Sequence, residues 1–510
     1  MTDTRALAPT TTRAGWRAWT ALVALMLPVL LVSVDNTVLT FALPGIAADL
    51  APTSAQQLWM IDAYSLVLAG LLVTAGSLGD RFGRRRMLLI GASGFGIVSV
   101  LAAFAPTAEL LIAARAGLGV FGAMLMPSTL SLLRTIFTDR DQRRLALAVW
   151  ASMFSAGAAL GPILGGFILE HFWWGAVFLL AIPMLVPMLI LVPLLVPESR
   201  DPRPGPVDLT SVALSMATMV PIVYGIKEIA VHGLSGTTAV LFAAGGGFGW
   251  LFVRRQLRLP VPMLDMALFR RPGFSGAVLV NLLSVTALVG FLYFVAQHLQ
   301  LVVGLAPMIA GVMLLPGMAA MIVGGIGVVP IARRYSPRAV IPAALAFSVA
   351  GYVMVAWSGA HELGVLIAAF AVLGVGIGAA ETVATELVLT RAEPEKAGAA
   401  SAVSETAYEV GAVLGTSILG GILTWWYRAT LDVPVGVPEE LAFASRETLA
   451  GAMHAAETVG GVAGEALRQA AAVAFDGGVV VTSLIGAGLV VVAGVIAATT
   501  LGRHREVDRR

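Results

Sequence analysis

Long runs of apolar residues, separated by short polar segments, repeat along almost the whole chain. A helix that crosses a membrane needs about 20 consecutive, mostly apolar residues, and fourteen runs reach that length. They lie at residues 19–43, 57–78, 87–105, 108–131, 145–169, 174–196, 207–230, 236–253, 274–297, 305–330, 339–358, 363–389, 398–426 and 477–501. The pattern predicts an all-α polytopic membrane protein with fourteen transmembrane helices.

Composition excludes a soluble protein of similar size. Hydrophobic residues make up 58% of the 510 residues and charged residues only 12%, about half the charged share of soluble domains. A net charge of +2 creates no global field for a nucleic acid, and the chain contains no cysteine. The missing cysteines exclude a disulfide framework, a thiolate metal site and a cysteine nucleophile.

Basic residues predict the orientation of the spans. If both termini are cytoplasmic, all but five of the 32 lysines and arginines fall in cytoplasmic loops and tails, which is the arrangement that membrane insertion favours. The exceptions are Arg115 and Lys227 within spans, and Arg428, Arg446 and Arg468 in an outer loop. We therefore expect cytoplasmic N- and C-termini.

An internal repeat divides the chain into two halves. Glycines of the fifth span and an arginine of the second inner loop recur 254 residues later. The matching pairs are Gly157 and Gly411, Gly161 and Gly415, Gly166 and Gly420, and Arg84 and Arg338. Parallel halves related by an axis along the membrane normal are typical of transporters.

The repeat predicts how the chain is organised. The expected segments are a cytoplasmic tail at 1–18, a six-helix half at 19–200, two inserted helices with a basic linker at 201–272, a second six-helix half at 273–501 and a cytoplasmic tail at 502–510. The second half contains a long outer loop at 427–476, in which the stretch 438–475 predicts two short helices. From Asp432 to Asp476 the loop carries seven acids and two arginines, which indicates a solvated cap or a vestibule that concentrates cations.

The inner loop after the second span carries a motif of glycines and charges. Its marked positions are Gly76, Asp80, Arg81, Gly83 and Arg84. Their spacing resembles the loop signature of the major facilitator superfamily. Gly83 permits a tight turn, and Asp80 beside Arg84 could form a latch between the halves that breaks in each cycle.

The fifth span carries a second motif, made of Gly157, Gly161, Pro162, Gly165 and Gly166. It resembles the motif associated with antiporters of the same superfamily. Glycines four apart share one helix face and allow another helix to approach closely. Proline removes a backbone hydrogen bond and bends the helix.

Two further motifs narrow the resemblance. The stretch from Asp35 to Pro44 is similar to the first-span motif of fourteen-span drug:proton antiporters, and Arg115 with Gly119 to their fourth-span motif. Leu118 departs from that motif, which usually has glutamine there. The resemblance covers essentially the whole chain and is greatest to actinobacterial pumps for quaternary ammonium compounds and dyes such as ethidium.

The resemblance implies a fold and an activity. The fold is the major facilitator fold, with fourteen helices arranged as 6+2+6. The activity is export of lipophilic organic cations in exchange for protons by alternating access, in the bacterial inner (plasma) membrane. A monomer embedded in lipid is expected, with no cofactor, no metal and no nucleic acid.

Ionisable residues inside lipid spans are costly and are functional candidates by default. The candidates are Asp35, Asp62, Arg115, Lys227, Glu228, Glu381, Glu386, Glu405 and Glu409. We expect Lys227 and Glu228 to lie at the outer interface, and Glu386 to extend toward the inner one.

Two groups of acids receive provisional roles. Asp35 and Asp62 lie toward the outer half and could line one cavity, and Trp59 shares a helix face with Asp62. An aromatic ring beside a carboxylate suits a lipophilic cation. Glu405 and Glu409 lie four residues apart on one face, where repulsion favours taking up a proton. Asp35 could instead be a structural capping group, Asp62 could simply reach the outer interface, and Glu405 and Glu409 could be structural hydrogen-bonding groups.

These arguments assign the candidate site residues. Proton coupling is assigned to Asp35, Glu405, Glu409 and Arg115, and substrate binding to Asp35, Trp59, Asp62, Glu381, Glu405 and Tyr408. The main alternative is the same fold exporting a neutral or anionic antibiotic or metabolite. An enzyme is not expected, because no nucleophile–base pair or metal-ligand spacing appears, and ATP-driven transport would need a phosphate-binding loop that the chain lacks.

Overall fold

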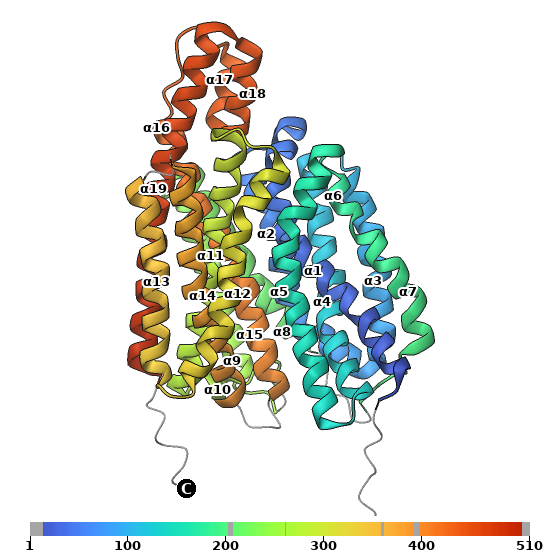
Figure 1. Ribbon diagram of the computed structural model, residues 1–510. Coiled ribbons are helices and arrows are strands. Elements are labelled where there is room, and N and C mark those ends of the chain that lie inside the picture. Colours follow the sequence, from blue (N-terminus) through green and yellow to red (C-terminus); the bar gives the residue numbers. More distant parts are fainter. Residues whose placement is uncertain (1–13, 202–207, 261, 359–361, 392–396, 502–510) are drawn as a thin grey trace, which may run out of the picture.

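The computed structural model describes residues 14–201, 208–260, 262–358, 362–391 and 397–501. Helices dominate these ranges and run side by side as two bundles (Figure 1). The start of α1 and the end of α19 lie at the same end of the molecule, which is the lower end in Figure 1.

The N-terminal bundle matches the predicted first six spans. Its helices are α1 (Trp16–Leu50), α2 (Ser54–Phe82), α3 (Arg84–Ala103), α4 (Ala108–Ile136), α5 (Arg140–His171), α6 (Ala176–Leu179) and α7 (Ala181–Leu195). Side-chain caps fix several starts: Thr53 forms a capping box with Gln56 at α2, and Asp139 accepts from the Gln142 N–H at α5.

The inserted pair and the second bundle follow. Their helices are α8 (Leu209–His232), α9 (Gly236–Gln256), α10 (Met266–Phe269), α11 (Pro272–Gln297), α12 (Pro307–Ala332), α13 (Pro337–Ser358), α14 (Leu363–Arg391), α15 (Ala397–Leu414), α16 (Gly421–Thr430), α17 (Glu439–Glu447), α18 (Leu449–Val459) and α19 (Gly461–Thr500). Two π-helical segments, η1 (His298–Val302) and η3 (Gly415–Gly420), continue α11 and α15.

Thirteen helices in the described ranges are long and apolar enough to cross a membrane. The predicted fifth span corresponds to α5, a helix of 32 residues that is outside this set of thirteen. The all-helical fold is confirmed, and the number fourteen remains a prediction.

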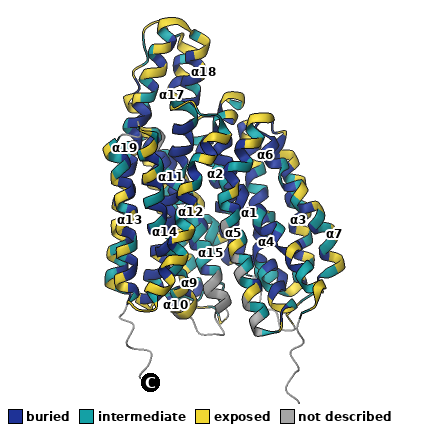
Figure 2. Ribbon diagram, viewed as in Figure 1, coloured by how far each residue is buried: buried dark blue, intermediate teal, exposed yellow. Residues whose placement is uncertain are grey.

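Each bundle has its own apolar core. One core joins buried residues of α1 to α7, and the other joins residues of α10 to α19 together with Phe41, Leu43 and Leu58 of the first bundle. Apolar side chains also cover the outer surface, where Ile97 is 64% and Leu194 76% exposed (Figure 2), as a surface that faces lipid requires. The inserted pair packs on the bundles mainly through α8, which contacts α2 and α16.

The segment at 427–476, for which the sequence predicts an outer loop, forms a cap at the upper end (Figure 1). The two short helices expected in 438–475 are α17 and α18, but the last third of that stretch belongs to α19, which already begins at Gly461. The α19 helix is 40 residues long and extends well beyond the predicted span at 477–501.

Candidate functional site

Asp35 of α1 is buried and paired with Arg115 of α4. The Arg115 Nη1 lies 2.6 Å from the Asp35 Oδ2, and the two residues are 1% and 7% exposed. The Arg115 Nε donates a hydrogen bond of 3.0 Å to the Met60 carbonyl oxygen, and the guanidinium lies 4.6 Å from the centre of the Tyr64 ring. The arginine supplies the countercharge that a buried carboxylate needs and ties together α1, α2 and α4.

Glu409 of α15 brings an acid of the second bundle to the same region. It is 2% exposed, and the side chains of Ser65 on α2 and Asn36 on α1 lie within hydrogen-bonding reach of its carboxylate. Arg115 acts on it electrostatically. Because Asn36 follows Asp35 in the chain, the seam between the bundles holds two acids near one arginine.

Asp62 of α2 lies in a second buried cluster. Its Oδ2 lies 2.7 Å from the Lys227 Nζ of α8 and accepts a hydrogen bond of 2.6 Å from the Ser417 Oγ of η3. The Lys227 ammonium also lies 4.2 Å from the centre of the Trp59 ring. Trp59 and Asp62 therefore share one face of α2, as their spacing predicts. The cation that lies against this face is the ammonium of Lys227.

The expectation that Lys227 lies at the outer interface is wrong. Its side chain is 2% exposed and faces the bundles because α8 packs directly on α2. A buried ammonium needs a carboxylate partner, and Asp62 provides it. Asp35 and Asp62 are thus each enclosed with a different cation.

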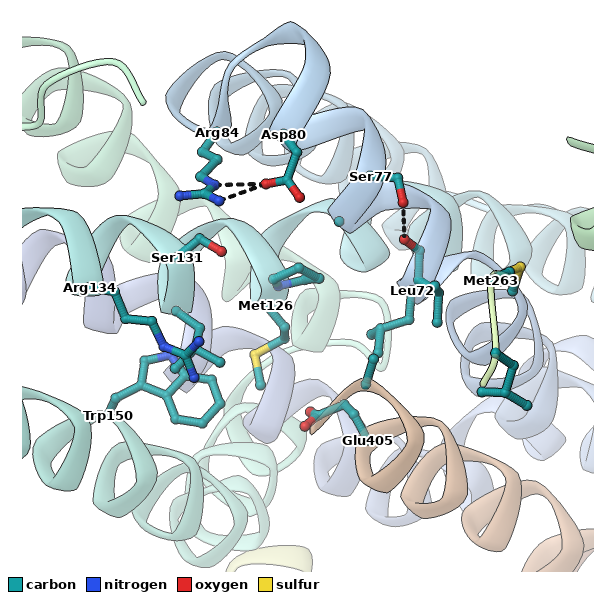
Figure 3. Close-up of a pocket in the computed structure, with 16 residues that line it drawn as sticks. Leu72, Ser77, Asp80, Arg84, Met126, Ser131, Arg134, Trp150, Met263 and Glu405 are labelled. Atoms are coloured by element: carbon teal, nitrogen blue, oxygen red, sulfur yellow. Dashed lines mark hydrogen bonds and ion pairs between the residues drawn. The ribbon is translucent and has the colours of Figure 1, made fainter. Parts of the chain in front are cut away.

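Glu405 of α15 faces a cavity of about 390 Å³ that lies toward the lower end. Figure 3 shows its carboxylate directed from α15 toward Met126 and the cavity. The walls combine apolar side chains such as Leu72, Trp150 and Met263 with the charged Asp80, Arg84 and Arg134, and the methionine among them is adaptable. This cavity lies between helices of both bundles and the linker after α9.

Glu381 of α14 lines a different cavity of about 690 Å³, bordered by α5 and α12. The two glutamates assigned to substrate binding therefore face separate spaces in this conformation. Tyr408 lies within electrostatic reach of Glu381, Glu405 and Glu409, which places it between the two glutamate regions.

The loop motif of the second span is held by the end of α7. Asp80 forms an ion pair of 2.8 Å with Arg84, and the Arg84 N–H donates to the Ser199 carbonyl oxygen at 2.9 Å. Gly83 has a φ of +113°, and a Cβ there would lie 2.7 Å from the Glu198 carboxylate carbon. These contacts lie within the N-terminal half, and a latch to the other half stays a prediction.

The glycines of α5 face two helices. A Cβ at Gly157 or Gly165 would collide with Ser33 or Val38 of α1. On another side, a Cβ at Gly166 would lie 2.5 Å from the Met308 Cα of α12. The motif therefore allows α5 to approach its own bundle and the opposite bundle at once, above the level of the lower cavities.

The match to known proteins agrees with this geometry. Residues 25–416 match the family model described as Major Facilitator Superfamily. The chain belongs to the major facilitator superfamily. Among solved structures of that fold class, a bacterial homologue of the human lysosomal transporter Spinster, described as inward-facing and unoccupied, aligns with a TM-score of 0.66 at 16% identity. That alignment covers 96% of this chain and 99% of the other.

Curated relatives are similar along their whole length. The multidrug efflux pump LfrA of Mycolicibacterium smegmatis is 53% identical over 97% of this chain and 98% of its own. The methyl viologen resistance protein SmvA of Salmonella typhimurium is 35% identical over 90% of this chain and 93% of its own.

Sequence reasoning missed two features of this superfamily member. One is the role of Lys227, for which a signal existed: the chain has only two lysines against thirty arginines, and this one lies within a span. The other is a polar cluster at the upper end, in which Glu447 accepts hydrogen bonds from Ser54 and pairs with Arg428 at 2.8 Å. Ser54 is almost 400 positions from Glu447 in the sequence, so no local pattern connects the two residues.

Proposed function

We propose that the chain is a proton-coupled multidrug efflux antiporter that exports lipophilic organic cations by alternating access. Relatives named for multidrug efflux and methyl viologen resistance support this assignment. The observation that carries it is Glu405, an acid that faces a cavity of about 390 Å³ between the bundles, where apolar walls such as Leu72 and Met263 lie beside charged groups. A carboxylate there can hold a proton or an organic cation, and the competition between them produces exchange.

The lower end is assigned to the cytoplasm of a bacterial cell, with the protein as a monomer in the inner membrane. Arg81, Arg84, Arg85 and Arg86 gather at the junction of α2 and α3, where the cavity of Glu405 also lies. Cytoplasmic loops carry such an excess of basic residues. In this orientation the described conformation presents Glu405 to the inside.

The acids at the seam suggest how protons and substrate compete. Glu409 contacts the N-terminal half through Asn36 and Ser65, and Glu405 lies one turn below it on α15. When the halves rock, the surroundings of both acids change. Protonation from the outside would neutralise the site and release the cation, and loss of the proton to the inside would restore the charge for the next cation.

The driving force limits the stoichiometry. Exchange of one proton for one monovalent cation moves no net charge, so the pH gradient drives it at about 1.4 kcal/mol per pH unit. A second proton adds about 2.3 kcal/mol per 100 mV of membrane potential. Glu405 and Glu409 together provide two protonatable groups for such a cycle.

Proteoliposomes with an imposed pH gradient test this function. Ethidium added on the substrate side should evoke proton movement in the opposite direction, and Glu405→Gln should abolish it while the protein stays folded. Thr406→Val, a neighbouring substitution without charge, is the matched control. Proton movement that persists in Glu405→Gln, or that no lipophilic cation evokes in the wild type, contradicts the proposal.

A second candidate is export of a neutral or anionic compound. Arg134 also lines the cavity of Glu405, while Asp80 is already paired with Arg84, so an anion would find a countercharge there. Arg134→Gln should weaken transport of an anionic dye and spare ethidium if this second candidate is correct. The opposite pattern supports cation export.

A further inference from the structure

The Lys227 ammonium occupies a site that three parts of the chain build together. The Asp62 carboxylate and the Trp59 ring come from α2 of the first bundle. Ser417, which donates to the same carboxylate oxygen, comes from η3 of the second bundle. The lysine comes from the inserted helix α8, so each of the three units contributes one element.

This arrangement has the chemistry of an organic-cation site. A carboxylate at 2.7 Å and an aromatic ring centre at 4.2 Å surround the Lys227 Nζ. The same two groups, a negative charge and an aromatic face, recognise ammonium ligands in general. The chain therefore supplies its own cation to a site that a cationic substrate would also fit.

An apolar groove leads away from this cluster toward the surface of the bundles. It has a volume of about 450 Å³ and lies between α8 and the segment formed by η3 and α16. Its walls include Ile226, Ile229, Ile418, Ile422 and Trp425, and Ser417 lines it as well. Since Ser417 also contacts Asp62, the groove adjoins the charge, and an apolar wall beside a carboxylate has the chemistry for a molecule with an apolar body and one positive charge.

We propose that Lys227 is a tethered counter-ion that holds the Asp62–Trp59 site in the absence of substrate, and that a lipophilic monocation seated in this groove displaces it. The inference rests on the proposed function in that the substrate is a cation. Without the lysine, Asp62 would be a buried carboxylate with no basic partner, which is strongly unfavourable. The inserted helices thereby gain a role in substrate selection.

The lysine has a place to go when it is displaced. It lies little more than one turn from the end of α8 at His232. A lysine has a flexible four-carbon stem and can extend its ammonium to the membrane interface. Displacement therefore exchanges one cation for another at Asp62 and leaves no charge buried alone.

Equilibrium binding of ethidium to the protein in nanodiscs, in alkaline buffer and without a proton gradient, tests the inference. Lys227→Met keeps the length of the stem and removes the competing charge. We expect it to bind ethidium at least about tenfold more tightly than the wild type, because a close buried charge pair has a coupling energy of that order or more. Binding of an uncharged dye such as Nile red should not change.

The double variant Asp62→Asn/Lys227→Met is the matched control. It removes both charges and leaves no unpaired group, so it should fold, and the gain in ethidium affinity should disappear. The thermal unfolding midpoint of each variant establishes that it is folded. Unchanged or weaker ethidium binding by folded Lys227→Met shows that the ion pair is only structural and overturns the inference.

The groove is tested separately by Ile418→Trp, which places a larger ring in its wall and narrows it. Ethidium affinity should fall about tenfold or more if the apolar body rests there, since a buried ring of this size contributes several kcal/mol of contact, while tetramethylammonium should bind as before. Equal binding of ethidium by both proteins would mean that its apolar body does not rest in the groove, and would overturn that part of the inference. Because these measurements need no proton gradient, a failure of proton exchange would not affect them.

Discussion

At the residue scale, two buried aspartates illustrate two ways to hold a charge. Asp35 is paired with Arg115 within one bundle, so a rigid rocking of the halves leaves that pair intact. Asp62 is paired with Lys227 of the inserted helix and bonded to Ser417 of the other bundle. The first pair is suited to maintaining the structure of a half, and the second is suited to exchanging partners.

The Asp35–Arg115 pair predicts a large effect on stability. We expect Arg115→Met to lower the free energy of unfolding by about 3–5 kcal/mol, because it leaves a buried carboxylate without its countercharge. Denaturant unfolding in detergent measures this. Asp35→Asn/Arg115→Met should recover much of the loss, and Arg468→Met, which removes an exposed pair with Glu465, should change little. A small effect of Arg115→Met would show that water or another acid compensates.

At the element scale, α5 and α8 each connect parts of the molecule. Along α5, Gly157 and Gly165 face α1, whereas Gly166 faces Met308 of α12. Because these glycines have no side chains, α5 packs closely against both α1 and α12 in the upper part of the seam. The inserted α8 instead joins the bundles through a charged side chain, Lys227.

The close contact of α5 with α12 predicts that one added methyl group at Gly166 destabilises the protein. Gly166→Ala should destabilise this conformation by about 1–3 kcal/mol, because overpacking forces a backbone shift. Gly327→Ala in α12 is the control, since a Cβ there meets no atom within 4 Å. Thermal unfolding and ethidium efflux measured side by side should show a loss for the first variant only. Equal behaviour would mean that α5 and α12 separate readily.

The start of α8 predicts a dependence on pH. The hydrogen bonds from Arg255 lower the pKa of Asp208, which caps this helix, from 3.8 to about 2. The stabilisation that the Asp208 carboxylate contributes to folding is therefore complete above pH 3.8 and is lost as the pH falls through about 2. The difference in unfolding free energy between wild type and Asp208→Asn should shrink across this window. When Arg255→Met is added to both proteins, the difference in unfolding free energy should no longer change with pH across this window.

At the scale of the whole molecule, the cavities of Glu405 and Glu381 lie toward the lower end, while the cap joins elements of both bundles at the upper end. The cap makes this connection through Glu447, which contacts Ser54 at the start of α2 and Arg428 at the end of α16. A small space beneath it is lined by Gln57 and Tyr293. Opening of the upper end must break this cluster.

The cap cluster predicts a change in accessibility. The chain has no cysteine, so Gln57→Cys introduces a unique thiol at a position that is 4% exposed. A membrane-impermeant maleimide should react with it slowly, and adding Glu447→Ala should speed labelling about tenfold, as expected for the loss of a buried charge-assisted hydrogen bond. Glu457→Ala in the same cap is the control. Equal labelling rates would place the seal elsewhere.

The fold was largely predictable because lipid imposes a simple rule on helices. Runs of about 20 apolar residues predicted the positions of the spans, and the spacing of Gly157 and Gly161 predicted close packing of α5. The extent of α19 was not predictable from hydropathy, because Glu465, Arg468 and Asp476 interrupt the apolar run although the chain there continues the same helix.

The candidate site was only partly predictable. Local spacing brought Trp59 and Asp62 onto one face, and the structure agrees. The partner of that face, Lys227, lies more than 160 residues away, and its position depends on how α8 docks on α2. Long-range docking of one helix on another leaves no periodic trace in the sequence, so Lys227 could be recognised as unusual but not placed.

The length of α19 has a consequence beyond transport. Its 40 residues rise by 1.5 Å each and so extend about 60 Å, about twice the hydrocarbon thickness of a bilayer. In the proposed orientation, with the lower end of α19 at the cytoplasmic membrane surface, the helix is long enough to hold α17 and α18 beyond the lipid headgroups on the opposite side. An antibody fragment raised against α17 and α18 should then bind from outside the cell, and it would serve both as an orientation marker in electron microscopy and as a route to inhibitors that never enter the cell.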